Sequence, residues 1–131
     1  MLVFDTGNPV FNPERRTAQP WSRQNAWEFW RQVRDHVVHI HIKDAIWNVG
    51  QAKETYTWPG EGNGFVSAIL KNAINRGYDG GVSIEPHMVS VFHGPQAQAV
   101  PAGAARENFI EYGRRLEDII SEARRQILTG T

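Results

Sequence analysis

Three short apolar segments alternate along the chain with three longer segments of helical periodicity, and this alternation constrains the fold most. The apolar segments, at about 2–5, 37–42 and 81–85, have the length and β-branched content of strands. The helical segments cover about residues 23–35, 64–76 and 104–127, with Ser22 as a candidate N-cap of the first. Strands that alternate with helices are typical of βαβ crossovers and a parallel sheet. We therefore predict one α/β domain over residues 1–131, with long loops at 43–63 and 87–103.

Each predicted strand ends in a side chain that can bind a metal ion. These side chains are those of Asp5, His41 and Glu85. The carboxyl ends of parallel strands share one edge of the sheet, where ligands bind in α/β folds. Because side chains alternate along a strand, the apolar neighbours point to the opposite face, toward the helices. We therefore expect the three polar side chains to lie together at one edge.

Two carboxylates and one imidazole form a ligand set for a divalent metal ion. Mn²⁺, Mg²⁺, Co²⁺, Fe²⁺ and Zn²⁺ all accept this set, and geometry and availability decide among them. Such an ion can hold two adjacent oxygens of a sugar. It would stabilise the enediolate that forms when a proton leaves the carbon next to a carbonyl.

Composition excludes several other classes of protein. The 14 Lys and Arg residues balance 14 Asp and Glu residues, so the chain lacks the basic excess of non-specific nucleic-acid or anionic-membrane binders. The absence of cysteine excludes disulfides, thiolate metal sites and cysteine nucleophiles. No apolar run approaches the roughly 20 residues of a membrane span, and the N-terminus lacks the layout of a signal peptide. We expect a soluble, cytoplasmic domain that binds neither nucleic acid nor membrane.

Five short motifs, in their order along the chain, resemble those of a known superfamily. They are DTGN at 5–8, HIHIKD at 39–44, PGEG at 59–62, GYDG at 77–80 and SIEPH at 83–87. This set resembles the xylose isomerase-like TIM barrels, which include sugar phosphate isomerases and epimerases, ketose 3-epimerases, hydroxypyruvate isomerases and inosose dehydratases. The resemblance covers about residues 2–120 and matches only the C-terminal part of the barrel. It implies a partial (β/α)8 TIM barrel with about the last three βα units.

The resemblance also implies roles for individual residues. Asp5, His41 and Glu85 would be metal ligands, and Glu85 would in addition be a catalytic residue that exchanges a proton with the substrate carbon. The substrate would be a small sugar or sugar phosphate, such as a ketose or a related polyol. A second acid/base glutamate, itself a ligand, belongs to the strand before the one that ends at Asp5, and we expect this chain to lack it.

Two other functions stay open at this stage. A catalytically incomplete barrel fragment would act only as a structural or oligomerising piece, since three strands leave two sheet edges that favour self-association. An endonuclease IV-like nuclease is a remote alternative. It expects histidines near position 8 and shortly before Gly60, where this chain has Asn8 and Tyr56. Neutral net charge also argues against a DNA substrate.

Further residues near the predicted strand ends are candidates for substrate binding. Asn8 can form a hydrogen bond with a sugar hydroxyl, and Lys43 can contact a substrate anion. His87 and Trp47 lie in the predicted loops, where they can contact the ligand. His93 and Trp58 are further candidates of the same kind, as a loop histidine and a loop aromatic.

Several of these residues also have a purely structural interpretation. Asp5 can cap the turn that follows it, as aspartates often do. His39 is expected to play a structural role one layer deeper than His41. Lys43 and Asp44 can form a solvated pair at the end of their strand.

Overall fold

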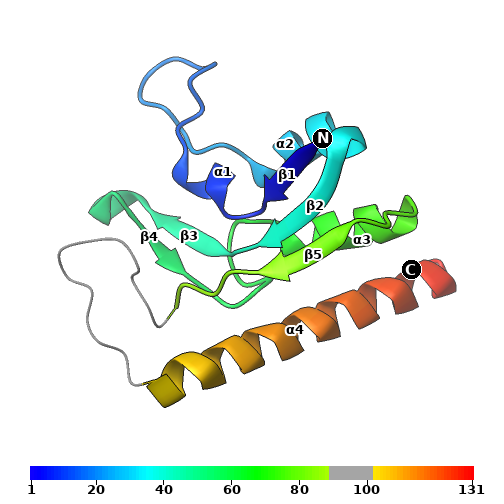
Figure 1. The fold of residues 1–131 in the computed structure, drawn as a ribbon. Helices are drawn as coiled ribbons and strands as arrows, with labels where there is room; N and C mark the ends of the chain where they lie inside the picture. Colours follow the sequence, from blue (N-terminus) through cyan, green and yellow to red (C-terminus); the bar gives the residue numbers. More distant parts are fainter. Residues whose placement is uncertain (89–101) are drawn as a thin grey trace.

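A computed structural model describes residues 1–88 and 102–131 and shows a mixed α/β fold (Figure 1). Along the chain the elements are β1 (Leu2–Asp5), α1 (Asn8–Phe11), α2 (Ala26–Val33), β2 (Val37–Ile42), β3 (Ala45–Asn48), β4 (Lys53–Tyr56), α3 (Val66–Asn75), β5 (Gly81–Ile84) and α4 (Ala102–Thr129). Two short 3-10 turns, Arg34–His36 and Val49–Gln51, follow α2 and β3. The predicted mixture of strands and helices is confirmed.

The strands β1, β2 and β5 form a parallel sheet with β2 in the centre. The register places Asp5 beside His41, and His41 beside Ser83. The ladder continues past the end of β5, because the Glu85 amide donates to the Ile42 carbonyl at 3.0 Å. The predicted parallel direction is therefore confirmed, and the three strands end at one edge of the sheet.

Helices α2, α3 and α4 pack on one face of this sheet, and α4 runs beside β5 (Figure 1). The core between them contains the buried side chains of Phe4, Trp30, Ile40, Ile42, Val66, Ile69, Leu70, Tyr112 and Leu116. Trp30 of α2 lies edge-on to Phe4 of β1, with ring centroids 5.3 Å apart. Burial of these alternate residues orients the strands, since a slip of one residue would move every core side chain to the other face.

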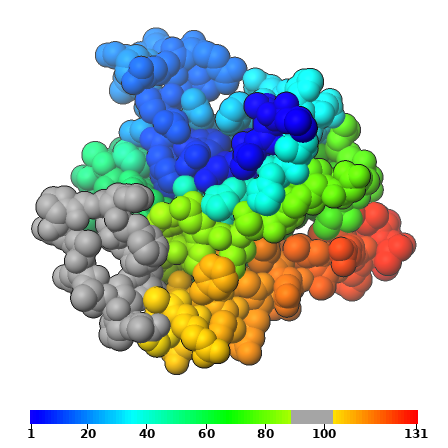
Figure 2. Space-filling view, viewed as in Figure 1, coloured from blue at the N-terminus to red at the C-terminus, as the bar shows by residue number. Residues whose placement is uncertain are grey.

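The opposite face of the sheet carries polar and exposed side chains. Val3, on this face, is 67% exposed, whereas its neighbour Phe4, on the helix-covered face, is 4% exposed. His39 and His41 point to the same face as Val3, because the register pairs Val3 with His39. Atoms of β1, β2 and β5 reach the molecular surface between α1 and α4 (Figure 2). The polar residues of this face, His39, His41 and Ser83, are partly exposed.

The first long helix begins later than predicted. Helix α2 starts at Ala26 rather than near residue 23, and its N-cap is Asn25, whose side chain accepts from the Glu28 amide at 3.0 Å. The candidate cap Ser22 instead accepts, through its carbonyl, from the Glu14 amide at 2.8 Å. Both residue types cap helices well, so the sequence does not separate them. The other two helices begin and end within two residues of their predicted bounds.

The predicted loop at 43–63 contains a hairpin, so that prediction is wrong in part. Strands β3 and β4 pair antiparallel, with Ala45 opposite Tyr56 and Asn48 opposite Lys53. Strand β4 has the sequence KETY, which lacks apolar alternation. The hairpin packs against α1, so pairing and tertiary contacts form it where intrinsic propensity does not indicate a strand.

Helix α4 is long, with 28 residues, but charged side chains recur along its whole length. Among the helices within residues 1–88 and 102–131, none combines the length and apolar character that crossing a membrane requires.

Candidate metal centre

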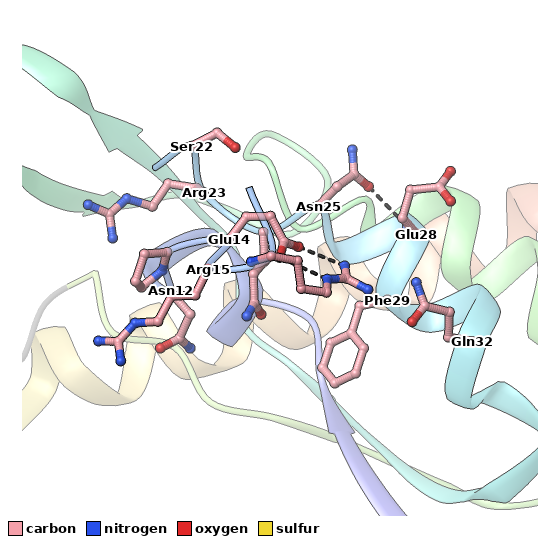
Figure 3. Close-up of a pocket in the computed structure, with 12 residues that line it drawn as sticks. Asn12, Glu14, Arg15, Ser22, Arg23, Asn25, Glu28, Phe29 and Gln32 are labelled. Atoms are coloured by element: carbon pink, nitrogen blue, oxygen red, sulfur yellow. Dashed lines mark hydrogen bonds and ion pairs between the residues drawn. The ribbon is translucent and has the colours of Figure 1, made fainter. Parts of the chain in front are cut away.

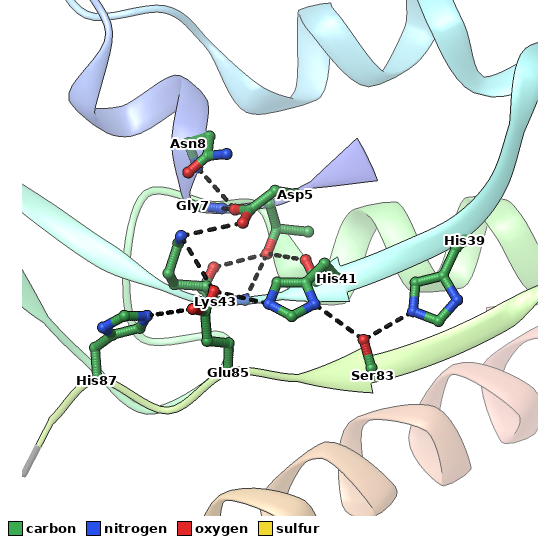
Figure 4. A network of polar contacts seen from close by, with 10 residues as sticks. Asp5, Gly7, Asn8, His39, His41, Lys43, Ser83, Glu85 and His87 are labelled. Atoms are coloured by element: carbon green, nitrogen blue, oxygen red, sulfur yellow. Dashed lines mark hydrogen bonds and ion pairs between the residues drawn. The ribbon is translucent and has the colours of Figure 1, made fainter. Parts of the chain in front are cut away.

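Asp5, His41 and Glu85 lie together at the carboxyl edge of the parallel sheet (Figure 4). One ligand atom from each side chain lies within 4.8 Å of the other two. All three residues are partly exposed, so the group is open to ions from solvent. The structure thus brings the three ligand candidates together as expected, and metal binding itself stays a prediction.

Asp5 uses its two carboxylate oxygens differently. Oδ1 accepts hydrogen bonds from the Gly7 amide at 2.8 Å and from the Asn8 amide at 2.9 Å. Oδ2 lies 3.1 Å from Nζ of Lys43. Asp5 therefore caps the turn, as its structural interpretation predicts, and still presents one oxygen to the site.

The imidazole of His41 lies between Ser83 and Glu85. Its Nδ1 is 2.9 Å from the Ser83 hydroxyl, and its Nε2 is 2.8 Å from Oε2 of Glu85. The same hydroxyl lies 2.7 Å from Nε2 of His39. Gly81 leaves room for this second imidazole, since a Cβ atom there would lie 2.7 Å from its Nδ1. A hydrogen bond at the second ring nitrogen is how metal-binding imidazoles are commonly oriented, so His39 and Ser83 act as supports for His41.

Lys43 also belongs to the site. Its Nζ lies 3.1 Å from Oδ2 of Asp5 and 3.4 Å from Oε2 of Glu85. Only 11% of the side chain is exposed, so the solvated pair with Asp44 is wrong. Burial lowers the pKa of Lys43, but the two carboxylates raise it more, and the net shift is upward. Lys43 is therefore held as a cation between two carboxylates.

Glu85 contacts three side chains that can carry positive charge. In addition to the contacts with His41 and Lys43, its Oε1 lies 3.0 Å from Nε2 of His87. Burial raises the pKa of Glu85, but hydrogen bonds from the two imidazoles and the charge of Lys43 outweigh it and lower the pKa from 4.5 to about 2. The carboxylate is thus charged at neutral pH, as a carboxylate must be to bind a metal ion.

Replacing Glu85 with glutamine is expected to remove stability that depends on pH. The pKa is 4.5 in the unfolded chain and about 2 in the folded one, so between these values only the unfolded chain binds the proton. The stabilisation by the carboxylate is therefore complete above pH 4.5 and is lost as the pH falls toward 2. Because 43% of the side chain is exposed, we expect a difference of only about 1 kcal/mol at neutral pH.

Urea denaturation of wild type and Glu85→Gln, from about pH 7 down to about pH 3, measures this effect. Glu107→Gln is a matched control, since Glu107 is exposed on α4. A difference between wild type and Glu85→Gln that stays constant over this range would contradict the charge pairing described for Glu85.

Tyr56 and Phe11 form an aromatic side of the site that the sequence pattern does not reveal. The Tyr56 ring stacks on the imidazole of His87, with centroids 4.8 Å apart and planes at 20°. Phe11 meets Tyr56 edge-on, with centroids 5.7 Å apart. Tyr56 is the last residue of β4, and the pairing of β4 with β3 brings it to the site. Its position therefore cannot be predicted unless the hairpin is predicted first. An aromatic surface beside charged groups suits a polar ligand that has an apolar face, such as a sugar.

Asn8 and His87, two of the candidate substrate contacts, border the site. Asn8 is exposed at the start of α1, where its amide donates to Asp5. The side chain of His87 is 12% exposed and lies against both Glu85 and Tyr56. Both residues are placed beside the ligand candidates, and contact with a substrate stays a prediction for each.

Trp47 and Trp58, the two candidate aromatic contacts, each have an arginine against the ring. The guanidinium of Arg23 lies 3.6 Å from the centre of the Trp47 ring, so it occupies one face of this ring. Trp58 has the same arrangement with Arg115, at 4.3 Å. Substrate contact by Trp47 stays a prediction, and contact with this face of the ring would require Arg23 to move. His93 lies outside the described residues.

Asp44 is a buried anchor directly after the site residues of β2. It is 1% exposed, and its carboxylate accepts four backbone hydrogen bonds of 2.8–3.0 Å, from Ala45, Gly60, Gly62 and Gly64. Burial raises the pKa of Asp44, and the four amides act against this shift. A Cβ atom at Gly64 would lie 2.8 Å from Oδ1 of Asp44, so the close approach requires glycine there. Through these hydrogen bonds the Asp44 carboxylate connects the segment before α3 to the end of β2.

A separate cleft of about 550 Å³ lies between the segment after α1 and helix α2 (Figure 3). Its charged side chains include Glu14 and Arg16, which pair with each other at 2.7 Å. None of the three ligand candidates lines this cleft. We therefore locate the candidate site at the strand ends, where the titratable side chains converge, and not in this cleft.

Comparisons with known proteins give no match to this chain, whether with protein-family models, with curated proteins or with solved structures. The functional assignment therefore depends on the residues of the site.

Proposed function

We propose that the chain is a sugar isomerase- or epimerase-like domain that uses a divalent metal ion for proton transfer next to a carbonyl. The observation that carries this proposal is the convergence of Asp5, His41 and Glu85 at the ends of three parallel strands. This ligand set suits Mn²⁺, Mg²⁺, Co²⁺, Fe²⁺ or Zn²⁺. The substrate class is a ketose, free or phosphorylated, or a related polyol. The resemblance to xylose isomerase-like TIM barrels supports the same assignment, with the parallel sheet as part of a barrel.

The residues of the site have distinct roles in this proposal. A bound divalent ion would supply Lewis-acid stabilisation of the enediolate. Glu85, which is unprotonated at neutral pH, would take the proton from the carbon next to the carbonyl, and stabilisation of the enediolate by the ion would make that carbon more acidic. Ser83 would hold the His41 ring in its ligating orientation, through the 2.9 Å contact with Nδ1. Tyr56 and His87 would bind the apolar face of the sugar ring.

Titration calorimetry with Mn²⁺ tests the metal centre. We expect wild type to bind the ion and His41→Ala to bind it at least about tenfold more weakly, because the imidazole ligand is lost. His36→Ala is a matched control, since His36 is exposed in the turn after α2. Equal affinities of wild type and His41→Ala would contradict the metal centre.

Exchange of substrate hydrogen with solvent deuterium tests the proton transfer. With Mn²⁺ present, incubation in D₂O with a panel of free and phosphorylated ketoses should place deuterium on the carbon next to the carbonyl. NMR of the recovered sugar locates the label and identifies the substrate class.

A second function, assembly without catalysis, is favoured by one observation. Leu2 and Val3 are 44% and 67% exposed on β1, which is an edge strand of the sheet. Exposed apolar side chains on an edge strand favour association with another chain. Concentration-dependent association in sedimentation, together with no deuterium exchange on any ketose, would support this alternative over the enzyme.

A further inference from the structure

The ammonium group of Lys43 contacts one carboxylate oxygen of each of the two acidic ligand candidates. Its Nζ lies 3.1 Å from Oδ2 of Asp5, the oxygen that the turn leaves free. It also lies 3.4 Å from Oε2 of Glu85, the oxygen that contacts His41. Figure 4 shows the amine between the two carboxylates. Lys43 therefore neutralises charge at the position where a divalent ion would do so.

The backbone of Lys43 is fixed, so this contact is built into the fold. Its amide donates to Oγ1 of Thr6 at 3.1 Å, and that hydroxyl donates to the Lys43 carbonyl at 2.7 Å. Thr6 is fully buried. The aliphatic stem then crosses Gly7, where a Cβ atom would lie 3.0 Å from Cγ and 3.1 Å from Cε of the lysine. Because glycine has no side chain, the lysine stem can pass close to the backbone at this position.

An aromatic ring also lies beside Nζ in this position. The centre of the Phe11 ring lies 5.7 Å from Nζ, within the range of a cation–π contact. A lysine side chain rotates about several single bonds between the backbone and Nζ, whereas Asp5 and His41 are held by hydrogen bonds to Gly7 and Ser83. If a divalent ion enters, the amine is therefore the group that can move while the ligands keep their places.

We propose that Lys43 is a built-in counter-ion of the site that competes with the divalent metal ion and sets its affinity. This inference rests on the metal centre proposed above and adds a residue that determines how tightly it binds. In the absence of metal the ammonium group prevents repulsion between the carboxylates of Asp5 and Glu85. Metal binding requires Nζ to leave both oxygens, and the displaced cation still opposes the ion from nearby. Both effects weaken metal binding relative to a neutral side chain at this position.

Calorimetric titration of Lys43→Met with Mn²⁺ tests this inference. We expect the variant to bind Mn²⁺ about tenfold more tightly than wild type. Lys53→Met is the matched control, because it removes the same charge from an exposed position on β4 and should leave the affinity unchanged. Lys43→Gln, which keeps a polar side chain of similar reach, should shift the affinity in the same direction and serves if Lys43→Met does not fold.

Thermal unfolding supplies a second measurement that does not depend on activity. Without metal, Lys43→Met should melt at a lower temperature than wild type, and saturating Mn²⁺ should raise its melting temperature by more than that of wild type. If wild type binds Mn²⁺ and neither variant binds it more tightly, the competition is overturned while the metal centre stands. If no variant and no wild-type protein binds Mn²⁺, both the metal centre and the competition are overturned.

Discussion

Asp44→Asn is expected to lower the free energy of unfolding by about 3 kcal/mol, although it changes only one atom of a side chain. The carboxylate is 1% exposed, and each of its oxygens accepts two backbone hydrogen bonds. In asparagine one of these oxygens becomes an amide group that donates. Whichever way it turns, two backbone N–H groups then face a donor and lose their acceptor. A hydrogen bond to a charged group contributes about 1.5–3 kcal/mol, and a buried donor without a partner costs more.

Chemical denaturation followed by tryptophan fluorescence measures this loss. Asp79→Asn makes the same chemical change at an exposed position and should alter the free energy of unfolding by less than about 0.5 kcal/mol. A loss for Asp44→Asn no larger than that of the control would show that the four amides do not depend on the carboxylate. Because these amides connect the end of β2 to the segment before α3, we also expect the hairpin and the site beside it to become more mobile.

The parallel sheet and the grouping of Asp5, His41 and Glu85 are predictable from the sequence because both depend on local patterns. Side-chain alternation along a strand follows from backbone geometry, and so does the common edge of parallel strands. The position of His39 is predictable in the same way, because residues two apart in a strand, such as His39 and His41, point to the same face. His39 therefore lies beside Ser83, one step deeper than His41, as expected.

The environment of Lys43 and Asp44 is not predictable in this way. Two adjacent charged residues at the end of a strand are usually solvated, and here long-range contacts decide otherwise. The carboxylates that hold Lys43 come from β1 and from the end of β5. The amides that hold Asp44 include those of Gly60 and Gly64, which lie far along the chain. Tyr56 reaches the site for a related reason, because the pairing of β3 with β4 brings it there.

Glu85→Gln is expected to slow deuterium exchange into the ketose by at least about 100-fold, if the proposed reaction is correct. General acid–base catalysis by a positioned side chain contributes about 10²–10⁴-fold, and the amide of glutamine cannot accept the proton at neutral pH. Glutamine keeps the length of the side chain and one oxygen that can approach the metal position. The substitution therefore removes proton transfer more completely than it removes the ligand.

The rate at saturating Mn²⁺ separates these two roles of Glu85. If the carboxylate moves the proton, exchange by Glu85→Gln stays slow after enough Mn²⁺ is added to fill the site. If the carboxylate is only a ligand, exchange recovers to the wild-type rate at high Mn²⁺, and that recovery would contradict the proposed proton transfer. Glu117→Gln, at an exposed position on α4, should exchange at the wild-type rate under all these conditions. The exchange rate of Glu85→Gln at saturating Mn²⁺ thus distinguishes a carboxylate that moves the proton from one that only binds the metal ion.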